Sequence, residues 1–327
     1  MFLSRISLPA PPTPEAEDIF SSALPALFTD DAPNSHGTPG SSVTYHSPRF
    51  GDLALRIPAY PGFEEGRKLF AHHLWNAGVI AADAIETASQ DHDERDRLDT
   101  QDPTHVLVQW NKKYWDVRGK RVLELGAGTA LPSLICALAG AASVTITDHP
   151  SSPALTSGAI EQNVRDNVLK RRRKRTTSIT NVDVFGYTWG TSKMYLTSHY
   201  GKPAPSQPDS FDRIIIADCL WMPMQHVNLV KTILRYLESS PTAPAPSSSP
   251  SSQQHQPDDQ ACVFVVAGFH TGRGIVRHFF KVQGRLRAAE IFEIDVSGIR
   301  RPWLPVREGE TKEQSKRWCV CAVLVRR

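Results

Sequence analysis

A glycine-rich turn follows a short apolar run in the 327-residue chain. Residues 122–134 read VLELGAGTALPSL, and Gly126-Ala127-Gly128 separates a predicted strand from a predicted helix. Glycines are needed where the chain turns sharply and a ligand lies against bare backbone. The first turn of the following helix also presents free N–H groups. A Gly-x-Gly pair alone is weak support for a ligand site, because ordinary tight turns share it.

An acidic residue at a second strand end strengthens the case for a nucleoside ligand. The next apolar run, SVTITD, ends in Asp148, twenty residues after Gly128. A carboxylate at this position can accept hydrogen bonds from both hydroxyls of a ribose. A dinucleotide fingerprint would have a small residue where Leu131 stands. We therefore favour an adenosine-containing ligand other than a nicotinamide cofactor.

Three other segments accompany this turn. They are LWNAG at 74–78, FGYTWG at 185–190 and ADCLWMPMQH at 217–226. Together with LELGAG they resemble the class I, seven-β-strand lysine methyltransferases often called family 16. The similarity runs from about Asp18 to the C-terminus. It is greatest to fungal members that methylate the N-terminus and lysines of translation elongation factor 1-alpha, some of which were earlier named nicotinamide N-methyltransferases.

The resemblance implies S-adenosylmethionine as cofactor and a protein amine as methyl acceptor, on elongation factor 1-alpha. It places around the cofactor Trp75, Gly126, Ala127, Gly128, Asp148, Trp189 and Ala217. A Trp189 indole offers a flat apolar face for adenine, and a Trp75 ring can shield a sulfonium by a cation–π contact. A buried core indole is the alternative role for Trp189.

Asp218 is the candidate catalytic residue. It ends the run FDRIIIAD, at the carboxyl edge where open α/β sheets bind ligands. Methyl transfer to an amine needs correct placement and a neutral nitrogen, so Asp218 is expected to orient the amine or receive its proton. Trp221 stands where the family commonly has Tyr or Phe, so no aromatic hydroxyl is expected there. His226 and His270 are more often structural and are left out of the expected site.

The elements that must position these residues alternate between strands and helices from Lys120 onward. This alternation predicts βαβ units and a parallel sheet. The fold class is therefore α/β, with a Rossmann-like, doubly wound, mostly parallel sheet. Seven strands, one of them antiparallel near the C-terminus, and an N-terminal cap are carried over from the resemblance. The last two strand-like runs, EIFEIDVS and RWCVCAVLVR, predict a closing antiparallel hairpin.

Composition shifts divide the chain into three parts. Residues 1–42 are expected to be a mostly irregular extension, residues 43–117 a cap, and residues 118–327 the cofactor-binding domain. In the cap, we expect a hairpin over 43–57, a helix from Glu64 and a second helix over 106–114.

Two segments of the cofactor-binding domain depart from the strand–helix pattern. The serine- and proline-rich run 239–260 predicts a disordered loop. The basic run 170–175 predicts a helix end, although such runs also occur as nuclear localisation signals or nucleic-acid patches.

Composition also limits the partners. Thirty-seven basic and 34 acidic residues give a net charge of +3, too small to indicate nucleic acid or an anionic membrane. Five cysteines lack metal-ligand spacing, so we expect reduced, mostly buried thiols and no metal site. Without a signal peptide or a membrane-length apolar run, we expect a cytosolic or nuclear protein, with the cytoplasm favoured, and a monomer.

Three other functions stay open at this point. A small-molecule N-methyltransferase acting on nicotinamide uses the same cofactor residues. A NAD-dependent oxidoreductase is a distant alternative because of Leu131. A methyltransferase-like binding module without catalysis is also disfavoured, because Gly126, Gly128, Asp148 and Asp218 are all present.

Overall fold

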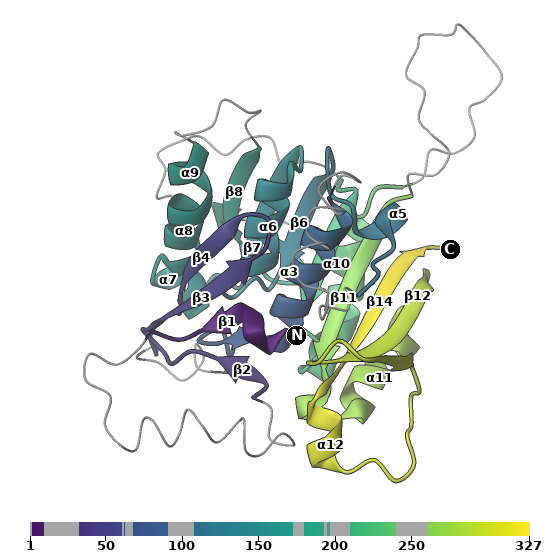
Figure 1. Ribbon diagram of the computed structural model, residues 1–327. Coiled ribbons are helices and arrows are strands. Elements are labelled where there is room, and N and C mark those ends of the chain that lie inside the picture. Colours follow the sequence, from purple (N-terminus) through teal and green to yellow (C-terminus); the bar gives the residue numbers. More distant parts are fainter. Residues whose placement is uncertain are drawn as a thin grey trace, which may run out of the picture.

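A mixed sheet of nine strands crosses the centre of the molecule (Figure 1). The computed structural model describes residues 2–9, 33–60, 62, 68–90, 108–172, 180–192, 195–196, 210–239 and 260–327. In spatial order the strands are β13 (Arg300–Pro302), β12 (Leu286–Asp295), β14 (Trp318–Arg326), β11 (Cys262–Gly268), β10 (Arg213–Ala217), β6 (Arg121–Leu125), β7 (Ser143–Asp148), β8 (Asn181–Gly186) and β9 (Tyr195–Leu196).

Seven of these strands reproduce the predicted sheet. The five strands β11, β10, β6, β7 and β8 are parallel neighbours. Strand β14 lies antiparallel between β11 and β12, which confirms an antiparallel strand near the C-terminus and the closing hairpin. The prediction of seven strands misses β9 and β13, two short antiparallel strands at the two edges. With two and three residues, they are too short to produce a recognisable pattern.

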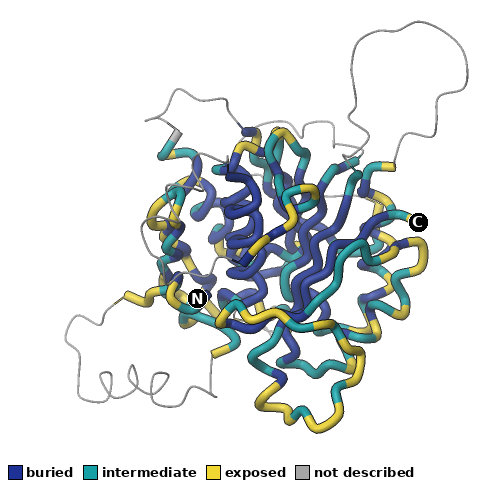
Figure 2. Tube along the Cα trace, turned by 45° about the vertical axis from the view of Figure 1, so that its right-hand side comes forward, coloured by how far each residue is buried: buried dark blue, intermediate teal, exposed yellow. Residues whose placement is uncertain are grey.

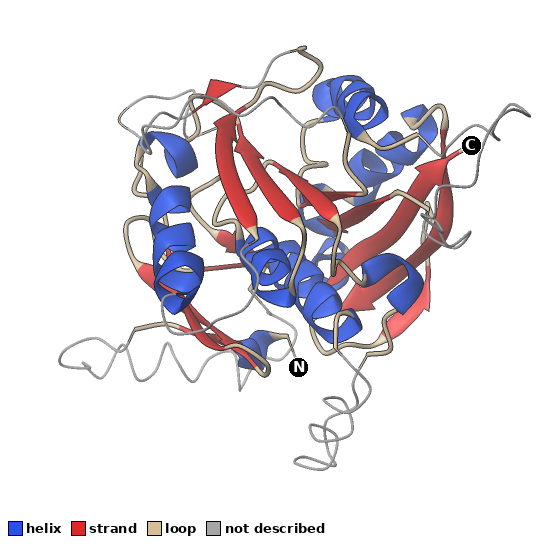
Figure 3. Cartoon of the chain, turned by 90° about the horizontal axis from the view of Figure 1, so that it is seen from above, coloured by secondary structure: helices blue, strands red, loops and turns tan. Residues whose placement is uncertain are grey.

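Helices cover both faces of the sheet, so that the strands run between two helical layers (Figure 3). One layer contains α3 (Asn76–Ala88), α6 (Leu131–Ala139), α7 (Pro153–Thr156) and α8 (Ala159–Val164), which continues through a π-helical turn (Arg165–Leu169) into α9 (Lys170–Arg172). The other layer contains α10 (His226–Tyr236) and α11 (Arg273–Val282). The connections include η3 (Pro223–Gln225), η4 (Phe269–Thr271) and α12 (Lys312–Lys316).

Burial on both faces explains why the central strands read as continuous apolar runs. In β10, Ile215 packs in the core beneath α3 and α6, whereas Ile214 and Ile216 pack in the core beneath α10 and α11. Successive side chains of a strand point to opposite faces, so a strand covered on both faces needs apolar residues throughout. The buried interior follows these strands through the molecule (Figure 2).

The N-terminal cap lies over the face that carries α3. The predicted hairpin is present as β3 (Ser42–Ser47) paired antiparallel with β4 (Gly51–Arg56). A short strand β1 (Ile6–Ser7) adds to this hairpin, after a 3-10 turn η1 (Leu3–Arg5). The described part of 1–42 is therefore partly ordered. Arg5 forms an ion pair of 2.5 Å with buried Asp83 of α3, which ties this segment to the domain.

In the described part of the chain, both predicted cap helices begin later than expected. Helix α3 begins at Asn76 because the preceding β5 (Leu74–Trp75) pairs with β2 (Ser35–His36), and this pairing prevails over helical spacing. The prediction of the second helix is wrong for residues 108–111, since α5 (Lys112–Trp115) begins at Lys112, capped by the Asn111 side chain. Residues 64–67 and 106–107 lie outside the described residues.

Other expectations fall partly on residues that the structure does not describe. Only Ser239 and Gln260, the ends of the predicted loop 239–260, are described. The basic run is described as far as Arg172, where α9 ends. All five cysteines are buried and unpaired, as expected. Among the described residues, no helix is both long and apolar enough to cross a membrane.

Candidate active site

The turn after β6 has the backbone conformation that its glycines were expected to supply. Gly126 has φ of 69° and Gly128 has φ of 54°, both in the left-handed region that glycine adopts without strain. A Cβ on Gly126 would lie 2.7 Å from Sγ of Cys219 and 3.2 Å from Cζ2 of Trp189. Gly126 is therefore needed for conformation and for space, whereas Gly128 faces open space.

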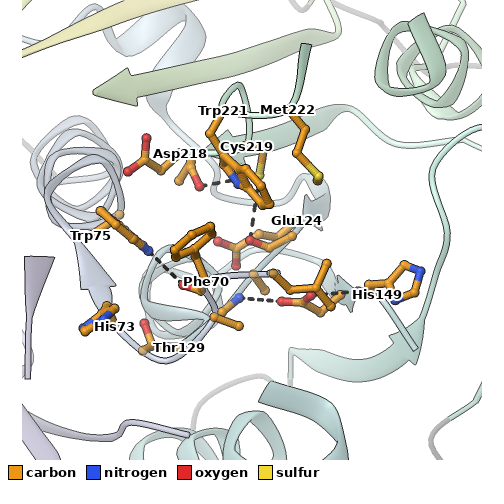
Figure 4. A pocket seen from close by; sticks show the side chains of 18 of the residues that line it. Phe70, His73, Trp75, Glu124, Thr129, His149, Asp218, Cys219, Trp221 and Met222 are labelled. Atoms are coloured by element: carbon orange, nitrogen blue, oxygen red, sulfur yellow. Dashed lines mark hydrogen bonds between the residues drawn. The ribbon is translucent and has the colours of Figure 1, made fainter. Parts of the chain in front are cut away.

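A cavity of about 270 Å³ opens at this turn (Figure 4). It lies at the carboxyl edge of β6, β7 and β10, where the sequence pattern placed the ligand site. All eight expected site residues line it: Trp75, Gly126, Ala127, Gly128, Asp148, Trp189, Ala217 and Asp218. The fold thus brings together residues that lie up to 143 positions apart in the sequence, from 75 to 218.

Asp148 is anchored at the end of β7 by backbone donors. Its Oδ2 accepts a hydrogen bond from N–H of Gly128 at 2.8 Å, and its Oδ1 accepts one from N–H of His149 at 2.7 Å. Burial raises the pKa of this carboxyl, and these hydrogen bonds oppose the shift. A carboxylate offers about four acceptor positions, so Asp148 can still receive hydroxyl donors from a ligand in the cavity.

Glu124 is a second buried carboxyl at the cavity. It lies on β6, and its Oε2 accepts a hydrogen bond from N–H of Ser133 at 3.2 Å, near the start of α6. Burial raises its pKa to about 8. Glu124 directly precedes Leu125 and the glycine turn in the sequence, and it was not among the expected site residues. A cationic ligand group near this carboxyl would favour its ionised form.

Asp218 occupies a strained position directly after β10. Its φ is 60°, which is uncommon for a residue with a side chain and costs about 1–3 kcal/mol where the fold imposes it. Its N–H donates to the carbonyl of Val266 at 2.8 Å, and its Oδ1 accepts from N–H of Gly268 at 3.1 Å. Burial raises its pKa, and His270 opposes this shift. These contacts aim the carboxyl into the cavity.

Aromatic rings form much of the remaining wall. Trp75 stacks on His270 with ring centroids 4.7 Å apart and planes at 17°, and its Nε1–H donates to the carbonyl of Phe70 at 3.1 Å. Phe70 meets Trp221 edge to face at 5.2 Å. Trp189, the expected adenine platform, lies against the Gly126 turn. The cavity therefore combines flat apolar faces with buried carboxylates (Figure 4).

Several lining residues were not expected from the sequence. Phe70, Trp221, Met222 and His270 all line the cavity, and His270 was set aside as a structural histidine. Its place two residues after an apolar strand, near the strand end as for Asp218, is the one sequence signal that it offers. His226 lies elsewhere and is structural, since its Nε2 pairs with the carbonyl of Leu220 at 2.9 Å in the protein interior.

The charge of the lining is one-sided. Glu124, Asp148 and Asp218 lie in the wall, and the described residues that line the cavity include no lysine or arginine. Phosphate recognition in proteins relies strongly on arginine and lysine, so this lining suits an uncharged or cationic ligand better than a pyrophosphate. Within the described part of the chain, no group of three or more His, Cys, Asp or Glu residues is placed to hold a metal ion.

Comparison with known proteins agrees with this geometry. A protein-family model described as lysine methyltransferase matches residues 62–247. The protein N-terminal and lysine N-methyltransferase EFM7 of Gibberella zeae is 32% identical over 170 residues, which cover 52% of this chain and 54% of that protein. The EFM7 protein of Kluyveromyces lactis is 31% identical over 230 residues, covering 66% of this chain and 69% of its own.

The extent of these matches differs between relatives. The chain spans about half the length of the Gibberella zeae relative and of an Emericella nidulans relative. A solved structure of a putative methyltransferase from Streptococcus mutans covers 64% of this chain and 45% of its own, with 14% identity and a TM-score of 0.36, too low to support a conclusion. The family match covers more than half of the 327 residues, and the chain belongs to the lysine methyltransferase family.

Proposed function

We propose that this protein is an S-adenosylmethionine-dependent N-methyltransferase that acts on a protein amine, either a lysine or an N-terminal α-amine. The observation that carries the proposal is the cavity at the carboxyl edge of the sheet. It joins a glycine turn, three buried carboxylates and several aromatic rings, without a lysine or an arginine among its described lining residues. The family match supports the same reaction.

The residues present fit this cofactor. Asp148 has acceptor positions left for ribose hydroxyls, and Trp189 offers a face for adenine beside Gly126. The bare backbone of Gly128 faces open space, so that a ligand can lie against it. Trp75 and Ala217, which also line the cavity, complete the proposed binding set. S-adenosylmethionine supplies an electrophilic methyl group on a positively charged sulfur, which suits a wall of carboxylates.

The same lining fails the test for a nicotinamide dinucleotide. A pyrophosphate needs cations or several free backbone donors, and one donor of the turn, the N–H of Gly128, is already bound to Asp148 at 2.8 Å. Leu131, at the start of α6, also stands where close helix–strand packing would need a small residue. These features favour a methyltransferase over an oxidoreductase.

The chain's own residues would then act mainly by position. Asp218 is fixed by the backbone of Gly268 and faces the cavity, so it can orient an incoming amine or receive its proton. Phe70, Trp75 and Trp221 form an aromatic wall of the cavity against which the acceptor side chain can pack. Orientation of two reactants accounts for much of the rate enhancement in such displacements.

Elongation factor 1-alpha is the acceptor that we propose from the resemblance to fungal family members. The names of the relatives, protein N-terminal and lysine N-methyltransferase, support a protein acceptor. We propose that the enzyme acts in the cytoplasm as a monomer, without a nucleic acid or a membrane as partner.

The test combines binding with transfer in one preparation. Calorimetric titration with S-adenosylhomocysteine should show micromolar binding. Labelled methyl groups should then pass to a band of cell extract at the size of elongation factor 1-alpha, and purified elongation factor should replace the extract. Absence of binding, or preference for a dinucleotide, would overturn the proposal. Methylation of nicotinamide without any labelled protein would assign a small-molecule acceptor instead.

Asp218→Asn tests the catalytic position within this proposal. The variant should bind S-adenosylhomocysteine nearly as well as the original protein, because the backbone contacts of the turn do not involve Asp218. Its turnover should fall by about 100-fold, the lower range for loss of a group that handles a proton. Equal turnover in the two proteins would remove Asp218 from the mechanism.

A further inference from the structure

Two neighbouring strands each deliver a titratable side chain to the same point of the cavity. Asp218 follows β10 directly, and His270 lies two residues after β11. The two strands are parallel neighbours, with Ala217 opposite Val266, so the residues that follow them leave the sheet side by side. Oδ2 of Asp218 lies 3.8 Å from Nδ1 of His270, and both residues line the cavity.

The orientation of the His270 ring is fixed by packing. Trp75 stacks on one of its faces, 4.7 Å away and 17° from parallel. On another side its Nδ1 lies 2.8 Å from the place that a Cβ on Gly268 would occupy, so glycine is required there. Within the described residues, no side chain or backbone group forms a hydrogen bond with the ring. With Nδ1 facing Asp218, Nε2 is the nitrogen left to accept a proton.

We propose that His270 is the group that removes the proton from the acceptor amine, and that Asp218 stabilises the resulting imidazolium; this proposal rests on the proposed function. The ammonium gives its proton to Nε2 of His270. The freed lone pair forms the new C–N bond as the C–S bond breaks, and that bonding pair stays on sulfur. His270 then releases the proton to solvent, which restores the neutral ring.

The acceptor needs such a group near neutral pH. A lysine with a pKa of about 10.4 is neutral in fewer than about one molecule in a thousand at pH 7, and an α-amine with a pKa near 8 in about one in ten. An imidazole transfers protons efficiently in this pH range. The Asp218 carboxyl lies 3.8 Å from Nδ1 of His270, which is close enough to interact with the positive charge that the ring carries after the transfer.

The other ionisable groups around the ring do not replace Asp218. Cys319 of β14, which pairs with Gly268, is a neutral thiol because burial raises its pKa well above the usual range. His73 lies on Trp75, 5.8 Å from that ring. Arg273, three residues after His270, directs its guanidinium to Glu293 and Glu310. Asp218 is thus the anion that faces the imidazole among the described residues.

The first experiment measures methyl transfer by His270→Asn from pH 6.5 to pH 10, with a peptide acceptor that carries a single amine. At pH 7 the rate should fall about 100-fold. Below the pKa of the amine, the variant's rate should rise about tenfold per pH unit as the free amine increases. Added imidazole should restore part of the rate. A deficit that stays constant over the whole pH range, or no deficit, would overturn the proposal.

His46→Asn is the matched control for that experiment. His46 also pairs with an aspartate, since its Nδ1 lies 2.7 Å from Oδ1 of Asp52. Its side chain is partly exposed on β3 and does not line the cavity. The His46 variant should keep the original pH profile. His270→Asn should keep its affinity for S-adenosylhomocysteine, which separates loss of the base from loss of the cofactor site.

A second measurement needs neither cofactor nor acceptor. The NMR resonances of the His270 ring should differ between Asp218→Asn and the original protein, because Nδ1 lies 3.8 Å from the Asp218 carboxyl. The His46 resonance in the same spectra should not move. Unchanged His270 resonances would overturn the pairing with Asp218. If the original protein transfers no methyl group to any amine, the proposed function fails; if it is active and His270→Asn equals it, only the assignment of the base fails.

Discussion

Buried carboxylates occur in two regions of this molecule, and the regions differ in what surrounds the charge. At the cavity, Glu124 and Asp148 accept hydrogen bonds from backbone N–H groups, and no lysine or arginine is among the described lining residues. Within β12, Glu293 lies 2.5 Å from Arg273 and 2.6 Å from Arg301. Both arginines also reach Glu310.

The two surroundings act on the pKa in opposite directions. Burial raises the pKa of all three cavity carboxyls. Burial also acts on Glu293, but the hydrogen bonds and charge of its arginines prevail and lower its pKa. Carboxylates that the chain neutralises with its own cations serve the fold. Carboxylates left with backbone donors keep an unmet preference for positive charge, which a cationic ligand can satisfy.

Glu293→Gln should have the largest effect on stability. Removal of one member of a buried ion-pair network leaves Arg273 and Arg301 with fewer partners, and such changes cost about 3–5 kcal/mol. Urea unfolding would measure the loss. Glu308→Gln is the control. Glu308 is exposed and lies two residues before Glu310, so its replacement should leave the urea midpoint almost unchanged. Equal stability of the Glu293 variant and the original protein would contradict a structural role for this cluster.

Asp148→Asn should affect binding more than stability. The variant keeps one oxygen for N–H of Gly128 but loses the charge, and hydrogen bonds to charged groups are worth about 1.5–3 kcal/mol. The affinity for S-adenosylhomocysteine should therefore fall about 10- to 100-fold in calorimetry. Asp183→Asn, within β8, should bind like the original protein. Unchanged affinity of the Asp148 variant would remove Asp148 from the proposed cofactor site.

Glu124→Gln should stabilise the folded protein, which is the opposite of the effect expected for Glu293→Gln. The folded protein favours protonated Glu124, with a pKa of about 8 against about 4.3 in an unfolded chain. The contribution of Glu124 to the free energy of unfolding is therefore complete below about pH 4.3, and it declines as the pH rises to about 8. Relative to the original protein, the variant should gain stability from pH 5 to pH 8.5 in urea unfolding. A difference independent of pH would refute the raised pKa.

Arg307→Met should have the smallest effect. Arg307 lies 3.6 Å from Glu293, which keeps its closer contacts with Arg273 and Arg301 when Arg307 is replaced. Partly exposed ion pairs contribute up to about 1 kcal/mol. The midpoint of thermal unfolding should fall slightly in this variant and much more in Arg273→Met. Similar losses in the two variants would mean that the contribution of each arginine to stability does not depend on its burial.

The sequence predicts the sheet well because its strands are covered on both faces. The run IIIA of β10 and the run CVFVVAG of β11 are apolar throughout, and each follows a helix or a loop. Helix α3 shows the limit of the same reasoning. All of its residues are buried. The exposed positions that would mark the end of an amphipathic pattern are therefore missing, and the predicted start of the helix was too early. The edge strand β13 leaves no signal in three residues.

The sequence predicted those site residues whose position in the fold requires one particular residue type. Gly126 and Asp148 follow from the turn and from the strand end, and both line the cavity. His270 was not predictable, because its position depends on the stacking of Trp75, which precedes it by 195 residues, and on the neighbouring β10. The left-handed backbone of Asp218 depends likewise on its contacts with β11. Such pairings exist only in the assembled sheet.

The position of β14 has a consequence for synthesis. This strand, Trp318–Arg326, lies between β11 and β12 and not at an edge. Until it is translated, β11 and β12 expose unpaired backbone groups, which favour pairing with other chains. Domains often fold while the ribosome is still adding residues. Here residue 326 must leave the ribosome before β14 can pair with both neighbours, so the facing edges of β11 and β12 stay unpaired until then.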